Sequence, residues 1–131
     1  MILTEEQRAI RDTARAFAQK ELAPFAQERE EKAAIPRAVL EAMGALGFMG
    51  MTVPAAYDGA EADNVSYALA LMEIAAGDGA ISTVMSGHNS VGCSIVLQQG
   101  TAAQKQRFLR PMATGRMLSC FCLTEPTGGS D

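Results

Sequence analysis

The chain of 131 residues is long enough for one domain with one core, and its alanine, leucine, methionine, glutamate and glutamine favour an all-α fold. The formal net charge is −4 and the Lys and Arg residues are scattered, which argues against a nucleic-acid-binding protein. No apolar run reaches the roughly 18–20 residues of a membrane span, and the N-terminus shows no signal-peptide core.

The first residues predict two helical stretches. Thr4 and Gln7 form a capping box, which places the start of a helix there. Apolar residues then recur at helical spacing as far as Leu22. Pro24 interrupts this run and is expected to lie in the first turn of a second helical stretch over about residues 25–33.

A charged cluster, Glu28–Lys32, is interpreted as a solvent-exposed face of the second stretch. Pro36 has the backbone angle preferred at the start of a helix, and Gly47 is suited to end that helix. Residues 48–54 are apolar but short, and Tyr57-Asp58-Gly59 is typical of a turn. This region is therefore predicted to be a packed connection rather than a sheet.

The next predicted helix begins at Asp63 or Asn64, either of which is a good N-cap, and runs to about Ala76. Its inward face is predicted to comprise Val65, Ala68, Leu69 and Met72.

Gly77-Asp78-Gly79 breaks that helix, and Asp78 or Ser82 begins another, which Gly100 ends. The apolar stripe of this helix is predicted to contain Val84, Met85, Val91, Ile95 and Val96.

A second capping box, Thr101 with Gln104, begins the last helix, and Gly115 closes it. Residues 117–123 are compact and apolar, as in a buried strand. We expect an up-down bundle of about six helices over residues 1–115, with residues 116–131 opening a β-domain. Because a strand without a partner is a poor end to a fold, the chain is expected to be a fragment.

The chain has three cysteines and one histidine. Cys93, Cys120 and Cys122 show no CxxC spacing, and His88 completes no zinc motif, so no metal site is expected. The cysteines are interpreted as small buried residues in a reducing, cytoplasmic compartment. His88 is interpreted as a hydrogen-bonded structural residue rather than a catalytic one.

The chain ends in the string CLTEPTGGSD, residues 122–131. Taken alone, such a string is typical of a surface loop. It also resembles the first signature of the acyl-CoA dehydrogenase family: a small or apolar residue, Leu, Thr, Glu, two variable positions, Gly, Ser and Asp. Thr127-Gly128 stands where many members carry a small residue pair of the Gly-Ala kind, and the pattern permits a threonine there.

The stretches upstream of this string resemble the N-terminal domain of the same family, in sequence and in order. They read LTEEQRAIRDTARAFAQKELAP, PRAVLEAMGALGFMGMTVPAAYDGA, HNSVG and GTAAQKQRFLRPMATG. The resemblance covers essentially the whole chain.

The resemblance implies an FAD cofactor, and the terminal string suits the flavin ring. An extended backbone over Phe121, Cys122, Leu123 and Thr124 offers N–H and C=O groups to the polar edge of the isoalloxazine. The Thr124 hydroxyl is expected to bond near flavin N5 and O4, where it would stabilise charge on the reduced ring. Phe121 packs either beside the ring or into the core, and Cys122 contributes its backbone.

The glycines that follow leave room for phosphates. Gly128, Gly129 and Ser130 have little or no side chain, so their N–H groups can approach a pyrophosphate closely. The resemblance places Ser130 near phosphate oxygens of FAD or near the bound CoA thioester. Thr83 and Gly87 are expected at the floor of the fatty-acyl pocket.

The function that the resemblance implies is α,β-dehydrogenation of an acyl-CoA thioester, with electrons passing to an electron-transferring flavoprotein. In the family the catalytic carboxylate comes from a C-terminal helical domain, so no catalytic residue is assigned in this chain. The intact protein is expected to be a homotetramer or homodimer, with the remaining domains completing the sites. The chain by itself is expected to be inactive and to hold FAD weakly.

Two alternatives remain open at this point. Acyl-CoA oxidases, nitroalkane oxidases and related flavin monooxygenases share the fold, although Thr124-Glu125-Pro126 favours a dehydrogenase. A non-catalytic helical interaction module would be marked by a damaged glycine–serine loop, and residues 128–130 are undamaged.

Overall fold

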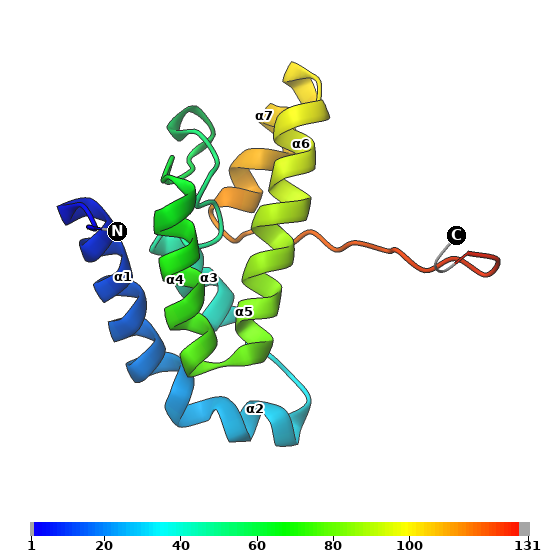
Figure 1. The fold of residues 1–131 in the computed structure, drawn as a ribbon. Helices are drawn as coiled ribbons and strands as arrows, with labels where there is room; N and C mark the ends of the chain where they lie inside the picture. The colour runs from blue at the N-terminus through cyan, green and yellow to red at the C-terminus, as the bar shows by residue number, and fades with distance from the viewer. Residues whose placement is uncertain (1, 129–131) are drawn as a thin grey trace.

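The computed structural model describes residues 2–128 and confirms the all-α class (Figure 1). The α-helices are α1 (Glu5–Phe17), α2 (Ala26–Lys32), α3 (Arg37–Ala45), α4 (Asn64–Gly77), α5 (Gly79–Ser86), α6 (Ser94–Gln99) and α7 (Ala102–Ala113). The π-helix η1 (Ala18–Leu22) continues α1, and the π-helix η4 (Gly87–Cys93) joins α5 to α6 as one helix. The 3₁₀ turns are η2 (Ala23–Phe25) and η3 (Ala55–Tyr57).

Helices α1, α3, α4 and the α5–η4–α6 helix lie side by side with alternating directions, and α2 runs across their lower end (Figure 1). In Figure 1, α1 descends to α2 at the bottom, α3 rises behind, α4 descends and the α5–η4–α6 helix rises again. Helix α4 packs mainly against α1 and α5. Within residues 2–128, no helix combines the length and apolar composition of a bilayer span.

The helix starts that the sequence predicts are confirmed. Both capping boxes are formed, at Thr4 and at Thr101. Asp63 caps α4 by accepting from the Ser66 amide, and Asp78 caps α5 by accepting from the amides of Ala80 and Ile81. Each cap satisfies amides that have no partner inside their own helix.

The core has two clusters of buried side chains. The larger cluster joins α1, η1, α3, α4 and α5 to the 48–51 connection, and Phe17 meets Phe48 edge-on at 6.2 Å between ring centroids. The smaller cluster lies around Leu109 and Met112 of α7 and includes Val53 and Cys93. The packed connection predicted for residues 48–54 is confirmed, since Phe48, Met49, Met51 and Val53 are all buried.

The predicted inward face of α4 is wrong for Ala68 and Met72, while Val65 and Leu69 are half-buried. Met72 is 68% exposed and Ala68 is exposed, whereas the buried residues are Ser66, Ala70 and Ile74. Helix α4 is apolar almost all round, so periodicity alone does not decide which side packs on α1.

The predicted exposed face at Glu28–Lys32 is wrong for Arg29, which is 8% exposed. Its guanidinium donates to the Asp78 carboxylate through Nε at 2.8 Å, and its Nη2 forms an ion pair with the same carboxylate at 2.7 Å. Arg29 also donates to the Leu22 carbonyl, so this pair connects η1, α2 and α5. A buried charge of this kind requires such partners.

The buried strand predicted at residues 117–123 is not formed. No strand is assigned in residues 2–128, and the only pairing there is an isolated bridge between Glu125 and Gly128. Phe121 and Leu123 are 62% and 71% exposed, and Cys120 and Cys122 are exposed, which contradicts their predicted burial. Strand hydrogen bonds need a neighbouring strand, and residues 2–128 supply none. Cys93 is buried as expected.

Candidate functional site

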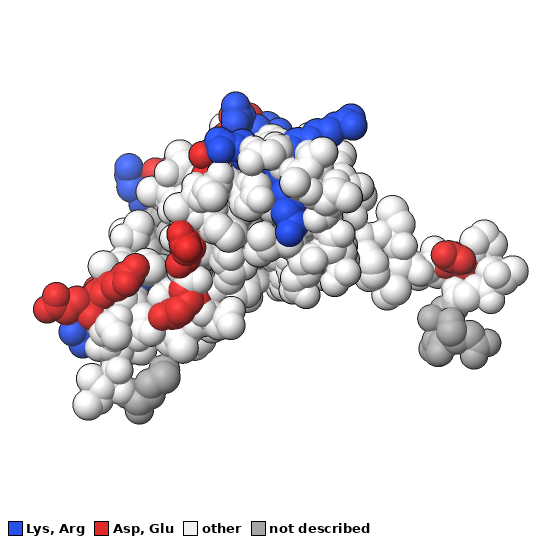
Figure 2. All heavy atoms as spheres, turned by 90° about the horizontal axis from the view of Figure 1, so that it is seen from above, with Lys and Arg blue, Asp and Glu red and all other residues white. Residues whose placement is uncertain are grey.

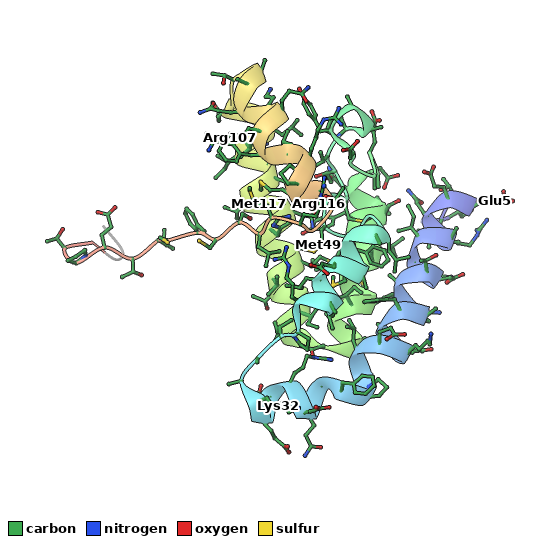
Figure 3. The ribbon with its side chains drawn as sticks, turned by 180° about the vertical axis from the view of Figure 1, so that it is seen from behind. Glu5, Lys32, Met49, Arg107, Arg116 and Met117 are labelled. Carbon is green, nitrogen blue, oxygen red and sulfur yellow. The ribbon has the colours of Figure 1, made fainter. Side chains whose placement is uncertain are left out.

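The candidate site is the extended segment 117–128, which leaves the helical body after α7. Figure 3 shows Arg116 and Met117 where the segment departs, and Figure 2 shows it standing clear of the body with almost no charged side chains. The start of the segment is held firmly. Arg37 of α3 donates to the carbonyls of Gly115 and Arg116, and the Met117 amide donates to the Pro111 carbonyl at 2.9 Å.

Two glycines allow α7 to turn into this segment. Gly115 has φ +72°, a left-handed conformation that residues with a side chain rarely adopt. Gly44 of α3 lies directly beneath the turn, where an added Cβ would be 2.2 Å from the Thr114 carbonyl oxygen. The site therefore begins at a close contact between the backbones of α3 and α7.

The π-helix η4 carries two neighbouring polar residues that are both 1% exposed, His88 and Asn89. The Asn89 side chain accepts from the Met51 amide at 2.8 Å and donates to the carbonyls of Phe48 and Met85 at 2.9 and 3.0 Å. Asn89 thereby fixes the 48–51 connection against the helix. Such π-helical turns are often found at functional sites.

The hydrogen bonding predicted for His88 is confirmed. Its Nε2 lies 3.0 Å from the Met112 carbonyl, and its Nδ1 lies 3.2 Å from the Ser119 amide and 3.1 Å from the Ser119 hydroxyl. A carbonyl only accepts, so the proton is assigned to Nε2 and Nδ1 accepts. Burial lowers the pKa of His88, and the bond to Met112 opposes this only in part.

His88 gives the free energy of unfolding a pH dependence in weak acid. Its folded pKa lies below the ordinary value of 6.5, so the neutral ring stabilises the fold above that pH. As the pH falls below 6.5 towards the folded pKa, we expect this stability to be lost at up to about 1.4 kcal/mol per pH unit.

Denaturant unfolding at several pH values between about 5 and 8 measures this effect. Carboxyl groups have ordinary pKa values below this range, so they contribute little to the change. In the His88→Gln variant the free energy of unfolding should not change with pH over this range, since His88 is the one histidine of the chain. An equal slope in the variant would assign the effect to other groups.

The structure places the predicted flavin-contact residues on exposed, extended backbone. Phe121, Cys122, Leu123 and Thr124 are all exposed, and within the described residues the backbone groups of 120–124 make no hydrogen bond. Beyond them, the Gly128 amide donates to the Glu125 carbonyl at 3.2 Å, which closes a turn around Pro126. The predictions for Gly129 and Ser130 lie outside the described residues.

The predicted acyl-pocket residues lie elsewhere on the molecule. Thr83 and Gly87 line an open groove of about 650 Å³ between α4 and the α5–η4 helix. Its other lining residues are Leu71, Met72, Ala75, Ser82, Ser86, Ser90 and Val91. None of residues 121–124 lines this groove, so the structure does not join the two predicted sets into one cavity.

The exposed segment fits a planar heteroaromatic ligand. N–H and C=O groups that are unpaired within residues 2–128 suit the polar edge of a flavin, and an exposed Phe and a Thr hydroxyl are present in the same stretch. Glu125 is the only carboxylate in residues 117–128, and it is exposed.

Sequence reasoning missed Asn89, Arg37 and Ser119 as residues that build the site. Asn89 could have been found, because a polar His-Asn pair in an otherwise small and apolar stretch indicates buried hydrogen bonds. Arg37 and Ser119 carry no such signal, since each bonds to groups more than twenty residues away.

Comparison with known proteins gives a consistent result. Residues 4–116 match the family model "Acyl-CoA dehydrogenase, N-terminal domain". An acyl-CoA dehydrogenase of Bacillus subtilis is 42% identical over 131 residues, which are 100% of this chain and 35% of the relative. The chain therefore spans about a third of the length of the curated relatives it matches.

Solved structures agree. One described as the electron transferring flavoprotein of Acidaminococcus fermentans has a TM-score of 0.94 and 37% identity, covering 99% of this chain and 34% of that chain. A glutaryl-CoA dehydrogenase from Mycobacterium smegmatis in complex with FADH2 has a TM-score of 0.92 and 34% identity, covering 98% of this chain and 33% of that chain. By sequence and by fold, the chain belongs to the acyl-CoA dehydrogenase family and comprises its N-terminal domain.

Proposed function

We propose that this chain is the N-terminal part of an FAD-dependent acyl-CoA dehydrogenase, which catalyses α,β-dehydrogenation of an acyl-CoA thioester. Residues 1–115 would be its helical domain, and residues 116–131 would begin a middle β-domain. The observation that carries the proposal is the exposed backbone of 120–124, whose hydrogen-bonding groups are unpaired within the described residues. The FADH2 in the glutaryl-CoA dehydrogenase complex supports a flavin as its ligand.

In this proposal the residues of the chain bind and orient. The Thr124 hydroxyl would donate to the N5–O4 edge of the flavin, Phe121 would pack beside the ring, and the backbone of Cys122 and Leu123 would follow its polar rim. Gly128, Gly129 and Ser130 would approach phosphate oxygens, and Ser130 would lie near phosphate oxygens of FAD or near the CoA thioester. Thr83 and Gly87 line the groove that receives part of the acyl chain.

The chemistry itself is completed from outside this chain. A carboxylate elsewhere in the enzyme removes the α proton, and bound FAD would accept the β hydrogen as hydride. Electrons would leave through an electron-transferring flavoprotein, and the similarity to the Acidaminococcus fermentans structure supports a partner of that class. The free thiols of Cys93, Cys120 and Cys122 are consistent with a reducing cytoplasm, where we place the enzyme, as a homotetramer or homodimer.

The test replaces Thr124 with valine, which keeps the shape and removes the hydroxyl, in the protein expressed from its whole reading frame. We expect the unaltered protein to carry FAD and to lose its flavin absorbance when an acyl-CoA is added without oxygen. In the Thr124→Val variant, flavin reduction should be slower by about tenfold or more, because a hydrogen bond to the charge of the reduced ring is lost.

The control is Thr127→Val, in the same exposed segment, which should reduce FAD at the unaltered rate. A protein without flavin, or a Thr124→Val variant as fast as its control, would contradict the proposal. Reoxidation by oxygen rather than by an artificial dye would indicate the oxidase branch of the fold. The 131-residue chain alone should show neither turnover nor tight FAD binding.

A further inference from the structure

Ser119 is the last residue of the segment that the helical body holds. It is half-buried, and residues 120–127 after it are exposed. Its amide and its hydroxyl both approach His88 Nδ1, at 3.2 and 3.1 Å. Whatever residues 120–124 bind, their position is therefore set at Ser119.

The contact is built closely enough to define one position. An added Cβ on Gly92, one helical turn after His88, would lie 1.9 Å from the Ser119 hydroxyl oxygen and 2.4 Å from its Cβ. Only a residue without a side chain at position 92 leaves room for Ser119 against η4.

The orientation of the His88 ring is fixed by a second hydrogen bond, independent of Ser119. Its Nε2–H donates to the Met112 carbonyl near the end of α7, which leaves Nδ1 as an acceptor aimed at Ser119. The ring thus connects the end of α7 to a point on the chain seven residues later, and both bonds depend on the same neutral tautomer.

The position of Ser119 also decides the register of the residues after it. In extended backbone, side chains alternate between two sides, so Phe121 and Leu123 share the side of Ser119, while Cys120, Cys122 and Thr124 take the other. A slip of one residue would exchange these sets.

We propose that His88 is a positioning residue for flavin binding: by holding Ser119 against η4, it fixes the register that presents Thr124 and the backbone of 120–124 to the ligand. The ligand in this proposal is the flavin of the proposed function. His88 touches neither flavin nor substrate and acts only through Ser119.

Two substitutions separate the two bonds of His88. The amide of asparagine lies near the position of Nδ1, so His88→Asn keeps an acceptor for Ser119 and loses the donor to Met112. The amide of glutamine lies near the position of Nε2, so His88→Gln keeps the donor to Met112 and loses the acceptor. If His88 served only the stability of the core, the two variants would affect residues 119–124 equally, or His88→Gln would be the milder of the two.

The readout is NMR on the 131-residue chain, with amide exchange at Ser119 and backbone relaxation at residues 120–124. In His88→Gln, Ser119 should exchange about tenfold faster and residues 120–124 should gain mobility, as expected for loss of one hydrogen bond. His88→Asn should stay close to the unaltered chain. The imidazole ¹⁵N shifts of the unaltered chain should show the Nε2–H tautomer.

Gly92→Ala tests the same contact without changing His88, because its Cβ displaces Ser119, and Ser90→Ala on the exposed side of η4 is its control. Gly92→Ala should raise the mobility of residues 120–124 as His88→Gln does. If a His88 variant does not fold, Gly92→Ala still shows whether the contact at Ser119 holds these residues. Unchanged mobility of 120–124 in both His88→Gln and Gly92→Ala would overturn the proposal.

FAD titration of the protein from the whole reading frame completes the test. Affinity should fall about tenfold in His88→Gln and stay within about twofold in His88→Asn, in step with the NMR result. Equal affinities in both variants despite a mobile segment would overturn the link to flavin binding. Absence of FAD binding in the unaltered protein would contradict the proposed function, while the NMR comparison would still decide whether His88 holds the segment.

Discussion

Replacing Arg29 with methionine is expected to lower the free energy of unfolding by about 3–5 kcal/mol. Asp78 and Arg29 are 9% and 8% exposed, and the variant leaves the Asp78 carboxylate buried without its cation. The Leu22 carbonyl also loses its donor. Urea denaturation of the unaltered chain and the variant, followed by circular dichroism, measures the difference.

The double variant Arg29→Met with Asp78→Asn is the matched control. Asparagine still caps α5 through the amides of Ala80 and Ile81 but carries no charge, so the double variant should be more stable than Arg29→Met alone. A double variant less stable than the single one would show that the buried charge is not the cause.

The loss of stability in Arg29→Met should depend on pH. Burial by itself would raise the pKa of Asp78, but hydrogen bonds from the Ile81 amide and from Arg29 outweigh it and hold the pKa below its usual 3.8. The stability from this carboxylate is therefore present above pH 3.8 and is lost as the pH falls through the lower folded value. The difference in the free energy of unfolding between the unaltered chain and Arg29→Met should therefore become smaller as the pH falls below 3.8.

Replacing Gly44 with alanine is expected to lower the free energy of unfolding by about 3 kcal/mol. The new Cβ would lie 2.2 Å from the Thr114 carbonyl oxygen and 2.9 Å from the Gly115 amide nitrogen, and these backbone atoms cannot rotate away. Helices α3 and α7 must then separate. Because the same turn carries the start of segment 117–128, the variant should also loosen Ser119, which amide exchange would detect.

Gly87→Ala is the control for this prediction. Gly87 is also helical, but its added Cβ meets nothing within 4 Å, so the substitution should leave stability unchanged or raise it by about 0.5–1 kcal/mol. Equal stabilities of Gly44→Ala and Gly87→Ala would mean that α3 and α7 do not pack as closely as the structure shows.

The sequence alone determined where helices begin. The capping boxes at Thr4 and Thr101 and the cap at Asp63 satisfy amides two or three residues away, so the signal is local and survives without knowledge of the fold. The terminal string indicated the family together with the stretches upstream of it, because all of them follow the order of the family's N-terminal domain.

Which residues face which neighbour was decided only by the tertiary structure. Met72 of the apolar helix α4 is exposed, and residues 117–123 form no strand within the described residues, because packing and pairing depend on partners that periodicity does not name. Arg29 and Asp78 are 49 residues apart, and His88 and Ser119 are 31 apart. Local composition set the helices of this protein, whereas its buried charges and the anchor of its candidate flavin segment exist only because folding brings distant residues into contact.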